Sequence, residues 1–182
     1  MKFSSYSIPG PKLIELEKKT DHRGFFARYY CEKEFLEQGL ETRWVQMNTT
    51  LTYQAGAIRG LHFQREPRVE AKVVRCLKGA IMDVIVDLRK GSETYGRWLS
   101  QKLTSKNRKM LYIPAGFAHG FQTLQENTEL LYMHSEFYSS QHEGGVLHSD
   151  PQLNIQWPLP ITEISDRDKS HPLFKDVSPI IV

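Results

Sequence analysis

The sequence contains little cysteine, and its cysteines do not follow the spacing of a metal site or a disulfide framework. Only Cys31 and Cys76 occur among 182 residues, and no C-x-x-C arrangement is present. Zinc knuckles and small disulfide-bonded domains need several cysteines at short, regular spacings. The pattern is typical of a protein in a reducing compartment, so we expect a cytoplasmic location.

Long hydrophobic runs are absent as well. The first ten residues, MKFSSYSIPG, contain no apolar segment of the kind found in a signal peptide. The longest apolar run, residues 80–88, is interrupted by Asp83 and Asp87. A membrane-spanning helix needs about 20 mainly apolar residues, so we expect no association with a membrane.

Charge of one sign does not dominate the chain. The 24 lysines and arginines exceed the 21 acidic residues by only three, and both signs are interspersed. Nucleic-acid-binding domains usually carry a basic patch or a basic stripe along one element. We therefore expect no nucleic-acid partner, and a few arginines converging on a small anionic ligand would explain the surplus.

Turn-forming residues divide the chain into short β-prone segments. The sequence has 12 glycines and 9 prolines, and the segments between them are rich in valine, isoleucine, tyrosine, phenylalanine and threonine. Residues 80–88 alternate most clearly, since one face is wholly apolar and the other carries Asp83 and Asp87. The pattern predicts an all-β fold of two stacked antiparallel sheets, in a single domain spanning residues 1–182. The other predicted strands are residues 12–17, 25–30, 43–51, 71–77, 96–103, 109–113, 119–123 and 129–136.

Few helices are expected, and all are short. Residues 32–38 are good helix formers followed by Gly39, a residue suited to the end of a helix. A turn at 105–108 with Ser105 as its cap, and a helical turn at 166–170, are further candidates. From residue 144 onward the chain is rich in proline, aspartate and serine, which predicts an ordered but irregular tail.

One stretch, residues 56–72, brings three chemically useful side chains together. Arg59 can hold a phosphate, His62 can take a proton near neutral pH, and Lys72 can stabilise an oxyanion. Together they suit proton abstraction beside a carbonyl. Taken alone, a histidine in a β-barrel is more often a hydrogen-bonded structural residue than a base.

Two motifs resemble those of the cupin superfamily, which implies a cupin-type β jelly roll with two antiparallel sheets. Residues 114–119 match P-x-G-x-x-H and end in His119. In the other motif, H-x-H, the first histidine is His62, and Gln64 stands in place of the second. The loss of that nitrogen argues against a transition-metal site, so we expect no metal.

Many further stretches resemble one metal-free branch of the cupins, the dTDP-4-dehydrorhamnose 3,5-epimerase family. They occur in one order over nearly the whole chain: residues 21–26, 46–48, 59–64, Lys72, 83–89, 113–121, Tyr132, Tyr138, Glu143, 150–151 and 155–158. The resemblance implies a cofactor-free isomerase that acts on a nucleotide-linked 4-keto-6-deoxyhexose. The favoured reaction converts dTDP-4-dehydro-6-deoxy-D-glucose to dTDP-4-dehydro-L-rhamnose.

The resemblance also implies roles for individual residues. His62 matches the base, Asp168 its carboxylate partner, Lys72 the cation beside the enolate oxygen, and Tyr132 the acid on the opposite face of the sugar. The expected substrate-binding residues are Arg23, Arg28, Gln46, Asn48, Arg59, His119, Tyr138, Glu143 and Arg167. The family forms homodimers in which an N-terminal strand joins the partner's sheet, so Arg23 and Arg28 would reach the neighbouring site.

Three positions depart from the family pattern. Arg28 replaces a usual glutamate, Arg167 replaces a lysine, and His148 replaces a tryptophan. Because Arg28 and His148 bear on nucleotide and sugar recognition, the nucleobase stays open, as does the choice between C3, C5 or both. The alternatives are a 3-only or 5-only epimerase of another deoxysugar, for example CDP-linked, a non-catalytic sugar-nucleotide-binding cupin, and a metal-dependent cupin oxygenase or isomerase.

The remaining polar residues are interpreted as structural. Asp83 and Asp87 are read as strand-surface or salt-bridged carboxylates, with Asp83 a candidate partner for His62 or His119. We expect the other histidines to be surface or loop residues: His22, His134, His142 and His171.

Overall fold

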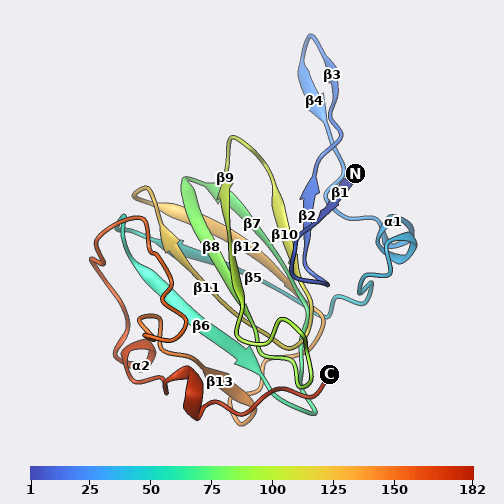
Figure 1. Ribbon diagram of the computed structural model, residues 1–182. Coiled ribbons are helices and arrows are strands. Elements are labelled where there is room, and N and C mark those ends of the chain that lie inside the picture. The colour runs from blue at the N-terminus through green and yellow to red at the C-terminus, as the bar shows by residue number, and fades with distance from the viewer.

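The computed structural model describes residues 1–182 and consists mainly of two antiparallel sheets stacked face to face (Figure 1). The expected cupin-type jelly roll is confirmed. In spatial order the six-stranded sheet contains β1 (Lys2–Ser5), β2 (Lys12–Glu15), β10 (Met110–Ile113), β7 (Lys72–Lys78), β12 (Thr128–His134) and β5 (Gln46–Thr52). The five-stranded sheet contains β13 (Glu143–Gly145), β6 (Ile58–Gln64), β11 (Phe117–Thr123), β8 (Ala80–Asp87) and β9 (Trp98–Thr104).

Most predicted strands are present with slightly different ends, and the errors have identifiable causes. Residues 25–30 were expected as one strand, but β4 (Gly24–Phe26) ends early and pairs only with β3 (Lys19–Asp21). The short strands β1, β3 and β13 lack a long alternation and were not predicted. β6 was not given as a strand because its sequence, IRGLHFQ, mixes charged and apolar residues without strict alternation.

The predicted helical segments are largely confirmed. α1 (Glu32–Glu37) ends before Gly39, whose φ of 67° is the left-handed conformation that stops a helix. α2 (Asp166–Lys169) begins after Ser165, whose side chain accepts a hydrogen bond from the Asp168 amide. Residues 105–107 form a turn without a helix, while η1 (Phe174–Asp176) is an additional 3₁₀ turn.

Apolar side chains fill three layers. The layer between the sheets contains Val74 and Leu130 from one sheet and Ile85 and Phe121 from the other. A second layer joins the outer face of the five-stranded sheet to the C-terminal tail. A third lies between the six-stranded sheet and the α1 region, where Phe35 is fully buried. Asp83 and Asp87 of β8 lie on the same side of the strand as Ile81 and Ile85, which face the layer between the sheets, so both carboxylates are buried and not on the surface.

The tail after residue 145 positions one wall of the later site. It runs beside β6 and carries α2 close to that strand (Figure 1). Ile155, Phe174 and Ile180 anchor it by packing on the outer face of the five-stranded sheet. Burial of each such side chain is worth about 1.5–3 kcal/mol, so these contacts anchor the tail on the sheet.

Two glycines let β6 and β11 approach unusually closely. A Cβ atom on Gly60 would lie 2.6 Å from the Cα of Gly120, and Gly60 has a φ of 118°. Any larger residue at either position would push the strands apart and displace the histidines they carry. His62 and His119 are directly paired in this register.

The hairpin β3–β4 stands away from both sheets (Figure 1). Its strands pair only with each other, and the three residues of β4 are exposed. None of the helices is long and apolar enough to span a membrane.

Candidate active site

A cavity of about 470 Å³ is lined by strands of both sheets and by the C-terminal segment. Ten of the thirteen predicted catalytic and substrate-binding residues line it. The predicted residues in its lining are Asn48, Arg59, His62, Lys72, His119, Tyr132, Tyr138, Glu143, Arg167 and Asp168. The strands bring these residues together from positions up to 120 apart in the chain, as with Asn48 and Asp168.

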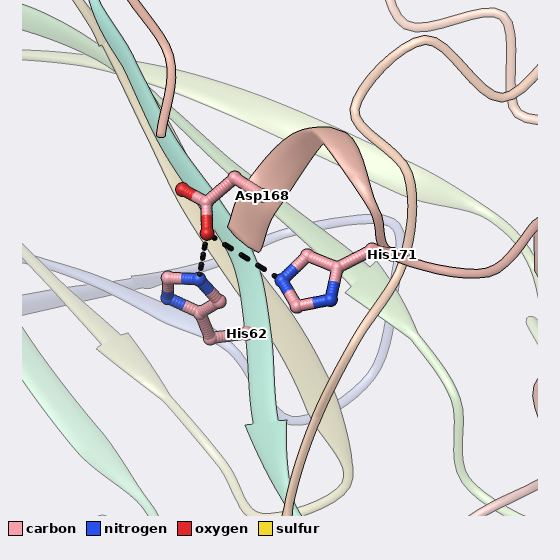
Figure 2. A group of neighbouring side chains, drawn as sticks. All are labelled: His62, Asp168 and His171. Atoms are coloured by element: carbon pink, nitrogen blue, oxygen red, sulfur yellow. Dashed lines mark hydrogen bonds and ion pairs between the residues drawn. The ribbon is translucent and has the colours of Figure 1, made fainter. Parts of the chain in front are cut away.

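His62 and Asp168 form a hydrogen-bonded pair. Nε2 of His62 on β6 lies 2.7 Å from Oδ1 of Asp168 on α2 (Figure 2). The second carboxylate oxygen of Asp168 accepts a hydrogen bond of 3.0 Å from the Gly60 amide. The other ring nitrogen of His62, Nδ1, points away from Asp168 (Figure 2).

The charge of Asp168 determines the tautomer of His62. Burial opposes ionisation of this carboxyl, but hydrogen bonds from His62 and from the Gly60 amide outweigh it and lower the pKa of Asp168 to about 2. An ionised carboxylate can only accept hydrogen bonds, so Nε2 of His62 must carry the proton. Nδ1 of the neutral ring is then left with a free lone pair and can act as a base.

Tyr132 faces the cavity from the other sheet. It lies on β12, is almost fully buried, and its hydroxyl is 3.5 Å from Oγ1 of Thr50. Burial raises the pKa of Tyr132, with a smaller effect of the same sign from Asp83. The phenol is therefore a proton donor at neutral pH.

Lys72 is fixed by a carboxylate. Its Nζ lies 2.9 Å from Oε1 of Glu70, and both side chains are only 9% exposed. Oε2 of Glu70 also accepts from Nδ1 of His134 at 2.8 Å. Burial opposes ionisation of Glu70, but Lys72 and His134 together lower its pKa. The cavity wall thus holds a positively charged ammonium in one place.

His119 is paired with Asp83, one of the two partners considered from the sequence. Its Nε2 lies 2.6 Å from Oδ1 of Asp83, and both side chains are buried. Burial raises the pKa of Asp83, and the interaction with His119 offsets this only in part. The His119 ring is edge-on to Tyr132, with centroids 6.2 Å apart.

Three predicted residues cluster at one edge of the cavity. The hydroxyl of Tyr138 donates to Oε2 of Glu143 at 2.8 Å, and Arg167 forms an ion pair with the same carboxylate. Hydrogen bonding to Glu143, followed by burial, raises the pKa of Tyr138. Tyr138 lies in the loop that follows β12, which ends at His134.

Arg59 and Asn48 line the cavity, whereas Gln46 supports it from behind. Nε of Arg59 donates to Oγ1 of Thr52 at 3.0 Å and Nη2 donates to the Leu51 carbonyl at 3.4 Å, which leaves Nη1 able to bind a ligand. Gln46 donates to Oδ1 of Asn48 at 3.3 Å and accepts from the Tyr138 amide at 3.2 Å.

Arg23 and Arg28 do not reach the cavity of their own chain. Arg23 lies at the tip of the β3–β4 hairpin, where it pairs with Asp21 at 2.6 Å. Arg28 follows the hairpin and pairs with Glu34 at 2.6 Å. Neither residue is part of the cavity lining.

Gln64, which replaces the second histidine of the H-x-H motif, has a structural role. Its amide nitrogen donates to the carbonyls of Arg68 and Phe137, and its oxygen accepts from the Ser139 amide at 2.6 Å. The buried side chain is therefore fully used in holding the loop after β12. It offers no free atom to a metal between His62 and His119.

Three residues near the centre of the site were missed or misread. Glu70 was not considered. His134 was wrongly expected to be a surface or loop residue, because it lies on β12, whereas His171 lies in a loop as expected. Their side chains are largely buried, and Nε2 of His171 lies 3.5 Å from Oδ1 of Asp168. Spacing could have found only His134, which is two residues from Tyr132 on β12, because Glu70 precedes β7 and His171 follows the end of α2.

Comparisons with known proteins show that the chain is similar to one family over nearly its whole length. A family model described as dTDP-4-dehydrorhamnose 3,5-epimerase matches residues 5–176. A protein of that name from Sinorhizobium fredii is 44% identical over 173 residues, covering 94% of this chain and 89% of the relative.

Solved structures are similarly close. A dTDP-4-dehydrorhamnose 3,5-epimerase from Elizabethkingia anophelis has a TM-score of 0.93 at 38% identity and covers 97% of each chain. One from Bacillus anthracis with TDP and PPi bound has a TM-score of 0.92 at 41% identity, covering 95% of this chain and 99% of the other.

Proposed function

Because the chain belongs to the dTDP-4-dehydrorhamnose 3,5-epimerase family, we propose that it epimerises C3 and C5 of a dTDP-linked 4-keto-6-deoxyhexose. The product would be dTDP-4-dehydro-L-rhamnose. The family supplies the isomerase chemistry, and the arrangement of functional groups around the cavity supports the role proposed for each residue.

One observation carries the proposal. His62 lies on β6 of the five-stranded sheet and Tyr132 on β12 of the six-stranded sheet, and both line the same cavity. Inversion at carbon requires that a proton leave one face of the sugar ring and that another arrive on the opposite face. A base and an acid on opposing walls meet this requirement.

In the proposed reaction, Nδ1 of His62 takes the proton from the carbon next to the C4 ketone. The electrons of the C–H bond move to form an enolate, and Lys72 stabilises its oxygen. Tyr132 then donates its proton to the other face of that carbon, and the C4 carbonyl re-forms. Asp168 keeps the tautomer of His62 correct and stabilises the imidazolium that the first step produces.

The nucleotide end is assigned to the charged edge of the cavity. Arg59 and Arg167 would meet the diphosphate, because guanidinium groups match phosphate oxygens. Tyr138 would stack on the base, with Glu143 and Asn48 as further contacts, while Gln46 would hold Asn48 and the Tyr138 backbone in place. The bound TDP in the Bacillus anthracis relative supports thymidine as the nucleoside.

Two further residues are assigned to a partner chain. The exposed hairpin carries Arg23 and is followed by Arg28, and neither reaches its own cavity. We assign the working form to a homodimer in which each hairpin completes the neighbouring site.

The test is proton exchange followed by NMR. Purified protein is incubated with dTDP-4-keto-6-deoxyglucose in deuterated water, and deuterium at C3 and C5 is measured with the configuration of each carbon. The wild type should incorporate deuterium at both positions with inversion. His62→Asn should slow incorporation by at least about 100-fold, since loss of a general base costs about that much.

Two variants complete the test. Tyr132→Phe should abolish inversion, and His142→Asn, a matched change outside the cavity, should retain full activity. Undiminished exchange in His62→Asn would reject the assigned base. Wild-type protein that binds the substrate but exchanges no proton would favour a non-catalytic binding module, and parallel incubation with the CDP-linked sugar tests the nucleobase.

A further inference from the structure

Three potential metal ligands converge beside the proposed base. Oδ1 of Asp168 lies 2.7 Å from Nε2 of His62 and 3.5 Å from Nε2 of His171. The three atoms all lie within 4.8 Å of one another. Figure 2 shows both rings turning a nitrogen towards the same carboxylate oxygen.

His171 supplies an independent sign of an unfilled site. Its side chain is only 10% exposed, and its Nε2 atom is buried without a hydrogen-bond partner. The ring is held against Gly145, where even a Cβ atom would come within 2.4 Å of it, and lies edge-on to His62 with centroids 5.4 Å apart. A buried polar atom without a partner is costly, and a bound ion would remove that cost.

We propose that His62, Asp168 and His171 form a reversible, inhibitory site for Zn²⁺ or a similar transition-metal ion. Two imidazole nitrogens and one carboxylate oxygen are ligands that zinc prefers, and three protein ligands leave a fourth position for water. Bonds of about 2.0–2.2 Å place tetrahedral ligands about 3.3 Å apart. The observed separations reach this geometry by small movements of α2 and the segment that follows it.

This site differs from the metal site of the cupin motif. It shares only His62 with that motif, and its other two ligands come from the C-terminal tail. Gln64 and His119 take no part, because their polar atoms are engaged with Ser139 and Asp83. The expectation of a metal-free reaction is therefore unaffected, since the ion opposes the reaction and does not assist it.

Metal binding would disable the base by changing its tautomer. In the free protein Nε2 of His62 carries the proton and Nδ1 has the lone pair. A metal on Nε2 needs that lone pair for itself, so the proton of the neutral ring moves to Nδ1. Nδ1–H cannot accept a proton from the sugar. This inhibitory part rests on the proposed function, whereas the binding of the ion does not.

The binding experiment uses the full chain treated with a chelator and then dialysed. Zn²⁺ is titrated by calorimetry, and Co²⁺ is added separately so that its visible absorption reports the coordination. One ion per chain should bind, and Zn²⁺ should displace Co²⁺. His171→Ala should weaken binding by at least tenfold, because loss of even an outer partner of a metal site costs about 10–100-fold.

Control variants distinguish metal binding at this site from misfolding and from metal binding elsewhere on the surface. His142→Ala removes a histidine outside the cluster and should bind Zn²⁺ as the wild type does, while circular dichroism verifies that each variant is folded. Asp168→Asn should also lose the Co²⁺ absorption. Absence of binding in the wild type, or equal binding in folded His171→Ala, overturns the site.

Inhibition is measured as a separate property. Epimerisation by the wild type should fall at least tenfold at saturating Zn²⁺ and recover with EDTA, whereas His171→Ala should keep its own zinc-free rate at the same concentration. If Zn²⁺ binds at the cluster but the wild type turns over at full rate, the inhibitory role is overturned. If the metal-free protein shows no epimerisation, the proposed function is rejected. The calorimetric and Co²⁺ data still test whether the three residues bind a metal ion.

Discussion

Glu70 and Lys72 lie on the cavity wall with Oε1 and Nζ 2.9 Å apart, and each side chain is about nine-tenths buried. The same carboxylate receives Nδ1 of His134 at 2.8 Å, so one acidic group orients two cavity residues. A long lysine side chain is normally mobile, but this contact fixes its ammonium at the cavity wall. The pair therefore links the stability of the protein to the proposed catalysis.

Replacing Glu70 by glutamine should damage both properties. Removing one partner of a buried ion pair leaves an uncompensated charge, which costs about 3 kcal/mol of unfolding free energy. Urea denaturation should show this loss in Glu70→Gln. The double variant Glu70→Gln with Lys72→Met should regain most of the stability but remain inactive. A double variant no more stable than the single one would contradict the ion-pair explanation.

The fold could be predicted because alternation is a local signal. The alternation in residues 80–88 predicts which side chains share a face, and β8 (Ala80–Asp87) covers all of that segment except its last residue. The short edge strands lacked such a signal, since three or four residues cannot establish a period. β4 was extended too far because Phe25, Phe26, Tyr29 and Tyr30 favour strands, yet no neighbouring strand continues the pairing beyond Phe26.

The site was only partly predictable because its contacts join distant segments. His62, Lys72 and His119 stand in recognisable motifs, and resemblance also indicated Tyr132 and Asp168. The pairing of His134 with Glu70 depends on the register of β12 against β7, which no local pattern specifies. His171 became part of the cluster only because the tail folds back over β13, as the contact between its ring and Gly145 shows.

Replacing Asp168 by asparagine should abolish activity by reversing one hydrogen bond. The Gly60 amide is a fixed donor to one side-chain oxygen, so the asparagine oxygen must remain there. Its NH₂ group then faces Nε2 of His62 and requires a lone pair on that nitrogen. The ring proton moves to Nδ1, and the base is lost.

The expected decrease in kcat for Asp168→Asn is about 10⁴-fold, as for a wrong tautomer in other histidine–carboxylate pairs. Asp166→Asn is the matched control, because that exposed side chain lies on the same helix and pairs only with Lys169. Steady-state assays should find this control fully active. An Asp168→Asn enzyme within tenfold of the wild type would show that the tautomer of His62 does not limit the reaction.

The same carboxylate should make stability depend on acidity. The pKa of Asp168 is about 2 in the folded protein, below its ordinary value of 3.8. Since the folded pKa is the lower one, ionised Asp168 stabilises the native state above about pH 4 and loses that effect as the pH falls towards 2. The contribution is about 2 kcal/mol, and about half of it should be lost by pH 3.

Urea denaturation at pH 5 and pH 3 measures this contribution. The difference in unfolding free energy between the wild type and Asp168→Asn should be smaller at pH 3. Asp166→Asn again serves as control and should differ from the wild type by a similar amount at both pH values. An unchanged Asp168→Asn difference would mean that the carboxylate is not stabilised by its partners.

The projecting hairpin should provide the contact between two chains. Phe25 and Phe26 are 40% and 72% exposed on β4, although large apolar side chains on a separate hairpin are normally covered. Phe26→Asp should therefore convert a dimer into a monomer in light-scattering measurements. The monomer should also be less active. The Arg23 side chain is 79% exposed on its own chain, so in the proposed dimer it would act in the neighbouring cavity, which the monomer lacks.

Mixed dimers distinguish this arrangement from a contribution within one chain. An Arg23→Ala chain and a His62→Asn chain should each be weakly active alone. After equal amounts are unfolded and refolded together, about half of the dimers should be mixed. In each of these, the cavity with intact His62 receives intact Arg23 from the partner, so about a quarter of wild-type activity should return. If Arg23 served its own cavity, both cavities of a mixed dimer would remain defective and mixing would restore no activity.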